Sequence, residues 1–432
     1  MWVTSAYVVT LLCDPPESLA ADTAGEANVT DVATSREPSA GGRSRVLLDG
    51  AAAPLLPAAR DVLLAAVDAG WADPRRLYAE GRRSRRLLDD AREAVASGLG
   101  VRPPEVSFLP TGPVALSAAV EGIRYASRRR GMRTVAGAVE HSAVLVPARA
   151  VAAASADAGL LDEVAVDDAG RVRLDTWDAA LDVDGTVVAA LQSANGEVGT
   201  RQPLGAAWEA CRTRGIPLVV DAQAGLGRDP VPEAYDVLVG DARSWGGPAG
   251  VGVLVVPERT RWRRPGAVSE AELGRTDAEP VVPLVLAAAE AWLAAAADRA
   301  AEAVRARKLV DQVRVGAARV PDTDVVGDPV DRLPHVVTFS CLFVDGEALV
   351  HELDRRGFAV ASGSACTAST LEPSHVLAAM GVLTHGNVRV TLPLAAAVPG
   401  GEAARAAGVR AFCEELPDAV AAVRAQLGTD RL

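Results

Sequence analysis

Lysine is almost absent from this sequence of 432 residues. Of the 44 basic residues only Lys308 is a lysine, and it lies inside a predicted helix; the others are arginines, as expected of a G+C-rich genome. Chemistry that needs a side-chain amine, such as Schiff-base formation, therefore has one candidate residue in the whole chain.

Four other features of the sequence limit the classes of protein to which this chain can belong. The five cysteines are scattered without a CxxC pair, which argues against a disulfide scaffold or a zinc site and favours a reducing cytoplasm. No run of 18 apolar residues is present, so no membrane span is predicted. A formal net charge of −12 argues against nucleic-acid binding, which needs a basic face. No histidine has metal-ligand spacing.

The N-terminal region is expected to lie outside the folded part. The apolar start, Met1 to Cys13, has no basic residue before it and no small-residue cleavage site close behind it, so we expect a cytoplasmic protein rather than an exported one. Residues 14–44 are polar and lack an apolar period. We therefore predict a disordered N-terminal extension over 1–44 and an ordered chain from residue 45.

From residue 45 onward, strand and helix patterns alternate. Apolar runs of strand length are predicted at 106–108, 134–139, 163–166, 186–192, 217–221, 235–240, 251–256, 336–339 and 388–391. Helices are predicted at 58–67, 84–99, 114–128, 143–158, 206–214 and from 282 to about 313. Alternation of this kind with nearly continuous apolar strands predicts an α/β fold whose mostly parallel sheet is covered on both faces.

One loop carries the most specific signal. Residues 241–252 read Asp-Ala-Arg-Ser-Trp-Gly-Gly-Pro-Ala-Gly-Val-Gly and lie between two predicted buried strands. This arrangement resembles the cofactor-lysine loop of cysteine desulfurases, which belong to the class V aminotransferases and depend on pyridoxal phosphate. In that family a His-Lys pair precedes the Gly-Pro. Arg243 stands at the histidine position here and Ser244 at the lysine position. Serine cannot form the Schiff base.

The resemblance extends from residue 48 to about residue 392. Residues 48–54 (Leu-Asp-Gly-Ala-Ala-Ala-Pro) and 195–199 (Asn-Gly-Glu-Val-Gly) match family segments in order and spacing. The resemblance implies aminotransferase fold type I. The large pyridoxal-phosphate-type domain would cover 61–299, and a small α/β domain would be formed by 45–60 and 300–432. The alternative to a cysteine desulfurase is another member of the same fold superfamily.

The resemblance also assigns the ring-binding residues. His141 takes the place of the histidine that stacks on the pyridine ring, and Asn195 belongs to the same site. Asp221 takes the place of the carboxylate that keeps the ring nitrogen protonated. A strand-end aspartate such as Asp221 can instead be an ordinary turn or helix cap.

At the phosphate end the sequence departs from the family. The family's Gly-Ala-Thr at a helix N-terminus, where backbone N–H groups hold the phosphate, aligns with Thr111-Gly112-Pro113, and proline has no N–H. Asp241 replaces a serine. Glu279 falls near the position of a threonine given by the partner subunit, with Thr276 as the competing assignment. Carboxylates here would repel a phosphate, although Arg243 could offset one of them.

The sulfur end is closer to the family. Residues 361–369 (Ala-Ser-Gly-Ser-Ala-Cys-Thr-Ala-Ser) resemble the loop whose cysteine receives sulfur, which assigns Cys366 as the catalytic nucleophile. A lone cysteine can also be an inert core residue. Arg389 matches the arginine that binds the substrate carboxylate, and a surface ion pair is the other reading.

The family converts L-cysteine to L-alanine and an enzyme persulfide, as a homodimer. Two hypotheses follow for this chain. It is a catalytically degenerate relative that acts as a binding or regulatory partner, for example of a functional desulfurase. Alternatively it remains active through Cys366, as a sulfur carrier that serves a sulfur-acceptor protein or as a lysine-independent pyridoxal phosphate enzyme. Neither reading needs a metal, nucleic acid or membrane.

Overall fold

A computed structural model describes residues 45–50, 53–155, 157–266, 269–362, 373–426 and 428. The predicted extension over 1–44 and the loop that contains Cys366 lie outside these residues. None of the helices described is long and apolar enough to cross a membrane.

The larger sheet has seven strands among the described residues, in the order β2-β8-β7-β6-β5-β3-β4. All neighbours are parallel except β8, which is antiparallel to β2 and β7. The strands are β2 (Val106–Leu109), β3 (Arg133–Gly137), β4 (Leu161–Val164), β5 (Thr186–Gln192), β6 (Leu218–Asp221), β7 (Val237–Asp241) and β8 (Gly252–Val255). The sheet is therefore mostly parallel, as the sequence predicts.

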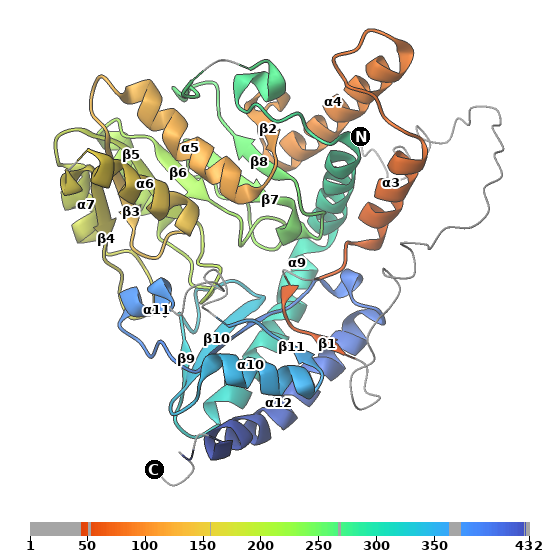
Figure 1. Ribbon diagram of the computed structural model, residues 1–432, viewed down its shortest axis with the longest axis vertical. Helices are drawn as coiled ribbons and strands as arrows, with labels where there is room; N and C mark the ends of the chain where they lie inside the picture. The colour runs from red at the N-terminus through yellow and green to blue at the C-terminus, as the bar shows by residue number, and fades with distance from the viewer. Residues whose placement is uncertain are drawn as a thin grey trace.

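Helices cover both faces of this sheet, so its strands are buried on both sides (Figure 1). The helices α5 (Gly112–Ser127) and α6 (Ser142–Ala154) pack on one face. The other face is covered by α3 (Pro57–Asp68), α4 (Ala79–Leu99), α7 (Leu174–Leu181), α8 (Leu204–Thr213) and the first half of α9 (Val282–Ala318).

A second core lies below the large sheet in Figure 1. Its antiparallel sheet has the order β12-β10-β9, and β1 pairs in parallel with β11 nearby. The elements are β1 (Val46–Leu47), β9 (Thr323–Val326), β10 (Val336–Cys341), α10 (Gly346–Arg355), β11 (Phe358–Ala359), α11 (His375–Met380), β12 (Asn387–Thr391) and α12 (Gly401–Gln426). The N-terminal Leu48 packs in this core with the C-terminal segments.

The helix α9 belongs to both cores. Its residues up to Ala295 pack in the first core, and those from Ala306 to Ala317 pack in the second. The boundary expected between residues 299 and 300 therefore falls inside one continuous helix.

The sequence reading misplaced or missed several elements. The strand expected at 163–166 is β4 (Leu161–Val164), and α4 begins at Ala79 rather than at residue 84. The strands β1, β9 and β11 were not predicted. Two of them have only two residues each, and β9 is a partly exposed edge strand, so none carries a clear apolar period.

Candidate functional site

The predicted site residues gather at one edge of the large sheet. His141 follows β3, Asn195 follows β5, Asp221 ends β6 and Asp241 ends β7. These four strands are parallel, so their carboxyl ends meet at the same edge. The structure thus brings together the residues that the sequence assigns to cofactor binding.

Asp221 is held at this edge by the residue two positions further on. Its Oδ1 accepts hydrogen bonds from the backbone N of Gln223 at 2.9 Å and from Gln223 Nε2 at 3.0 Å. Burial raises the pKa of Asp221, and His141 opposes that shift. His141 is half-buried and caps α6, since its Nδ1 accepts from Ala143 N at 3.0 Å.

Asn195 holds the loop after β5. Its Oδ1 accepts from Glu197 N at 2.8 Å and Val198 N at 2.9 Å, and its Nδ2 donates to Val139 O at 3.2 Å. Both ends of the amide are therefore engaged with backbone, and the residue fixes the loop beside His141.

Sequence reasoning did not single out Glu140, which is fully buried beside His141. Its Oε1 accepts from Gln192 N at 2.8 Å, while Oε2 has no hydrogen-bond partner among the described residues. Burial raises the pKa of Glu140 to about 8, and the charge of Asp221 adds to that rise. The missed signal is a carboxylate directly after a buried parallel strand.

Replacing Glu140 with glutamine should flatten the pH dependence of stability. The folded protein holds the carboxyl proton of Glu140 more tightly than the unfolded chain does. The stability that this proton contributes is therefore complete below about pH 4.5 and is lost as the pH rises to about 8. The free energy of unfolding of the wild type should fall across this range, by at most about 1.4 kcal/mol per pH unit. Urea unfolding at several pH values measures this slope. The exposed Glu163, paired with Arg149, is the control, since Glu163→Gln should keep the slope.

Arg389, in the middle of β12, lies near a second buried carboxylate, Glu197. Burial raises the pKa of Glu197 to about 7, and a hydrogen bond with Ser374 and the charge of Arg389 lower it. The Nε of Arg389 is buried without a hydrogen-bond partner among the described residues. This environment does not match a surface ion pair, the alternative reading for Arg389.

Asp241 is 4% exposed and contacts the N-terminus of α5. Its Oδ2 accepts from Gly112 N at 2.8 Å, and its Oδ1 accepts from the backbone N of Arg243 at 3.1 Å and from Arg243 Nε at 3.0 Å. The expected offset of this charge by Arg243 is therefore present as an ion pair.

Ser244, which the sequence resemblance aligns with the family's lysine, directs its hydroxyl toward the main chain. Ser244 Oγ lies 2.9 Å from Leu226 O and 2.9 Å from Asp241 O, so it donates its proton to backbone carbonyls. The backbone carbonyl of Ser244 accepts from Arg228 Nε at 2.7 Å. The hydroxyl of Ser244 therefore links two backbone segments and is not directed at a ligand.

Glu279 and Thr276, the two candidates for the position given by the partner subunit, make contacts within this chain. Glu279 pairs with Arg75 at 2.9 Å, and Thr276 Oγ1 accepts from Ala278 N at 3.1 Å. Cys366 lies outside the described residues. No group of histidine, cysteine and acidic side chains that could hold a metal occurs in the part of the chain that the structure describes.

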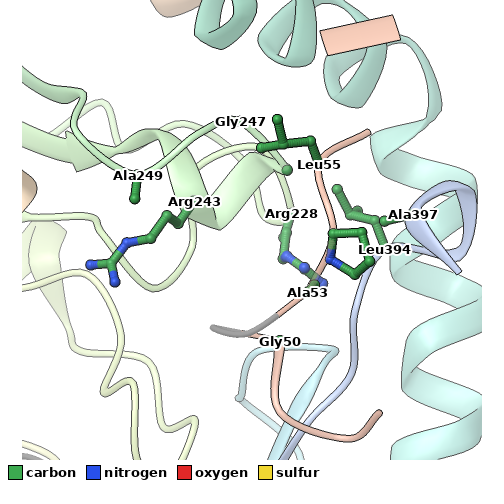
Figure 2. A pocket seen from close by; sticks show the side chains of 11 residues that line it. Gly50, Ala53, Leu55, Arg228, Arg243, Gly247, Ala249, Leu394 and Ala397 are labelled. Carbon is green, nitrogen blue, oxygen red and sulfur yellow. The ribbon is translucent and has the colours of Figure 1, made fainter. Parts of the chain in front are cut away.

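A small cavity of about 110 Å³ lies beside the loop that carries Ser244. Figure 2 shows Arg228 near the centre of the lining, Leu394 and Ala397 to its right, and Arg243 at the left of the view. The remaining lining residues are Gly50, Pro54, Leu55, Gly246, Gly247 and Ala249. His141, Asn195 and Asp221 do not line it, so this cavity is separate from the ring-binding residues.

Comparison with known proteins identifies the family. The aminotransferase class-V family profile matches residues 46–398. The chain is 30% identical over 331 residues to the cysteine desulfurase IscS of Dictyoglomus turgidum, covering 75% of this chain and 83% of that protein. The chain belongs to the cysteine desulfurase family. It is also 32% identical over 360 residues to a cysteine desulfurase of Cereibacter sphaeroides, covering 81% of this chain and 90% of that protein.

Solved structures show the same fold. A NifS-like protein superposes with a TM-score of 0.77 at 22% identity, covering 87% of this chain and 98% of that one. DndA of Streptomyces lividans superposes with a TM-score of 0.66 at 26% identity, covering 80% and 98%. The chain therefore has aminotransferase fold type I, with helices on both faces of a mostly parallel sheet.

The cysteine desulfurase family depends on pyridoxal phosphate, and the described residues fit only the ring of this cofactor. His141 and Asp221, which lie close enough to interact at the carboxyl ends of β3 and β6, are residue types that could stack on a pyridine ring and keep its nitrogen protonated. The amine for a Schiff base is absent at Ser244, whose hydroxyl is engaged with backbone. The residues at the phosphate end do not fit either, since Asp241 already accepts from Gly112 N. No cofactor-dependent step is derived for this chain.

Proposed function

We propose that this member of the cysteine desulfurase family forms no Schiff base with pyridoxal phosphate and acts as a binding or regulatory protein. The observation that carries the proposal is the hydroxyl of Ser244, which is bonded to Leu226 O and Asp241 O at the position that the resemblance gives to the lysine. Lys308 supplies no substitute amine from nearby. It lies in the half of α9 that packs in the second core.

The proposed partners follow from the resemblance to the family. We propose a homodimer that contacts a functional desulfurase or a sulfur-acceptor protein, in the cytoplasm. The five scattered cysteines support a reducing compartment. The altered residues at Ser244, Asp241 and Pro113 support a role in which the fold is kept for its surfaces rather than for catalysis.

Borohydride reduction tests the absence of a Schiff base. Purified protein incubated with pyridoxal phosphate, reduced and digested should yield no pyridoxyl-modified peptide, because the site holds no amine. Mass spectrometry of the peptide that contains Lys308 and of the peptide that contains Ser244 gives the result. A stoichiometric adduct on Lys308 would overturn the proposal. A functional cysteine desulfurase treated in parallel is the positive control.

The sequence around Cys366 favours a second candidate, a sulfur carrier that receives and donates a persulfide. The described cysteines are poor candidates for this chemistry. Burial raises the pKa of Cys211 to about 12 and also raises the pKa of Cys341. Burial raises the pKa of the half-buried Cys413 as well.

Alkylation rates distinguish this candidate. Cys366 should react with iodoacetamide well before Cys211 and Cys341, because a thiolate must be both formed and accessible. Persulfide transferred from a functional desulfurase should then appear on Cys366 and be lost in Cys366→Ser. Peptide mass spectrometry over a time course measures both. Reaction of Cys366 as slow as that of the two buried cysteines would remove the carrier candidate.

A further inference from the structure

The first turn of α5 has no free backbone donor. An α-helix leaves the N–H groups of its first turn without intrahelical acceptors, and together with the helix dipole they attract anions. Here Gly112 N donates to Asp241 Oδ2 at 2.8 Å and Val114 N donates to Thr111 Oγ1 at 3.2 Å. Pro113 has no N–H, and Ala115 N already bonds to Thr111 O at 3.0 Å.

We propose that the carboxylate of Asp241 occupies the anion-binding position at the N-terminus of α5. It thereby closes the corner formed by Gly112, Gln223 and Asp241 to phosphate-bearing ligands. The carboxylate supplies the negative charge that a phosphate would otherwise bring to the helix end. This inference deepens the proposed function, which cites Asp241 as an altered residue but rests on the missing amine at Ser244.

The carboxylate of Asp241 also accepts hydrogen bonds from Arg243. Besides Gly112 N, its carboxylate accepts from Arg243 N at 3.1 Å and Arg243 Nε at 3.0 Å, and Arg243 Nη2 lies 3.4 Å from Oδ2. These N–H donors hold the carboxylate at the start of α5. A second anion brought to the same helix end would be repelled by it.

The corner is also filled sterically. A Cβ placed on Gly112 would lie 2.1 Å from Gln223 Oε1 and 2.7 Å from the Cβ of Asp241. The start of α5 therefore packs directly against Gln223, just beyond β6, and against Asp241 at the end of β7. Asp241 is the side chain whose removal would open the corner and free a donor at once.

Thermal unfolding with inorganic phosphate tests the inference. Wild-type Tm should be insensitive to about 20 mM phosphate when compared with sodium chloride of equal ionic strength. Asp241→Ser should lower Tm by at least about 2 °C, and phosphate should restore about half of that loss by binding to the freed Gly112 N–H and Arg243. Asp241→Ser combined with Arg243→Ala should lose most of this response.

Asp345→Ser is the matched control. Asp345 caps α10 by accepting from Ala348 N at 2.8 Å, so its loss also removes a carboxylate from a helix N-terminus. Asp345 is exposed and pairs with no arginine among the described residues, so Asp345→Ser should gain no phosphate response. If Asp241→Ser does not fold, Asp241→Asn keeps the volume without the charge and should also lower Tm.

Two outcomes overturn the inference. An equal phosphate response in the wild type and in Asp241→Ser would show an open anion site beside an intact Asp241. No response in any Asp241 variant, or a wild-type Tm in Asp241→Asn, would show that the helix end does not use the carboxylate as its anion. Neither outcome depends on Schiff-base formation, so failure here is distinct from failure of the borohydride experiment.

Discussion

Replacing Ser244 with lysine should leave the release of sulfide from L-cysteine at the level of the wild-type protein. The new amine would stand at the right position in the loop, but the phosphate end would still lack free donors, because Asp241 holds Gly112 N and Pro113 offers none. Each charged hydrogen bond missing from the cofactor costs about 1.5–3 kcal/mol. Two of them reduce cofactor affinity by roughly 10²–10⁴-fold.

Sulfide release with added pyridoxal phosphate measures this, with Ser244→Ala as the control for loss of the hydroxyl and a functional desulfurase as the positive control. The triple change of Ser244→Lys, Asp241→Ser and Pro113→Thr should bind the cofactor at least about 10²-fold more tightly than Ser244→Lys alone. Sulfide release by the single variant at rates typical of an enzyme would show that the phosphate end is intact.

Replacing Glu302 with alanine should destabilise the protein by about 3–5 kcal/mol, the range for breaking a buried ion pair. Glu302 is 4% exposed on α9 and pairs with Arg405 on α12, which is 3% exposed; Arg405 Nη2 lies 3.2 Å from Glu302 Oε2. Glu302 Oε1 also accepts from Ala395 N at 3.3 Å. Its removal leaves the Arg405 guanidinium buried with less compensation, and the buried Arg228 nearby loses a favourable charge.

Urea unfolding of the variant gives the change in the free energy of unfolding. Asp298→Ala is the matched control on the same helix, since Asp298 is half exposed and pairs with Arg305, and it should cost no more than about 1 kcal/mol. A loss for Glu302→Ala as small as that of the control would show that the buried pair is not a major contribution to the packing of α9 against α12.

The sequence predicts the sheet and its helices well because their signals are local. Val187 to Leu191 form a continuous apolar run and are buried in β5, and the loop after β7 carries a motif readable in twelve residues. The strands predicted at 134–139 and 217–221 likewise put His141 and Asp221 at or just after strand ends, where the structure has them. It fails for β1 and β11, whose pairing joins residues more than three hundred positions apart.

The chemistry of Asp241 could be predicted only in part. Its identity signals a charge conflict with a phosphate, and the sequence reading inferred repulsion. That the same carboxylate accepts from Gly112 N depends on how the start of α5 meets the end of β7, a contact between residues 129 positions apart. The burial of Glu140 likewise depends on the packing of β3 against β5 and the loop beyond. Such contacts arise from tertiary packing, which no local pattern encodes.

The helix α9 has 37 residues and connects the two halves of the molecule without a break. At 1.5 Å per residue it is about 55 Å long, and one end of it packs in each core. Rotation of one half against the other must bend this helix or slide a core along it, because α9 provides no loop that could act as a hinge. The spacing between the large sheet and the smaller one is thereby held nearly fixed. A molecule held in this way keeps the relative position of its two halves, and so the same surface, when a partner binds, whether or not the protein catalyses a reaction.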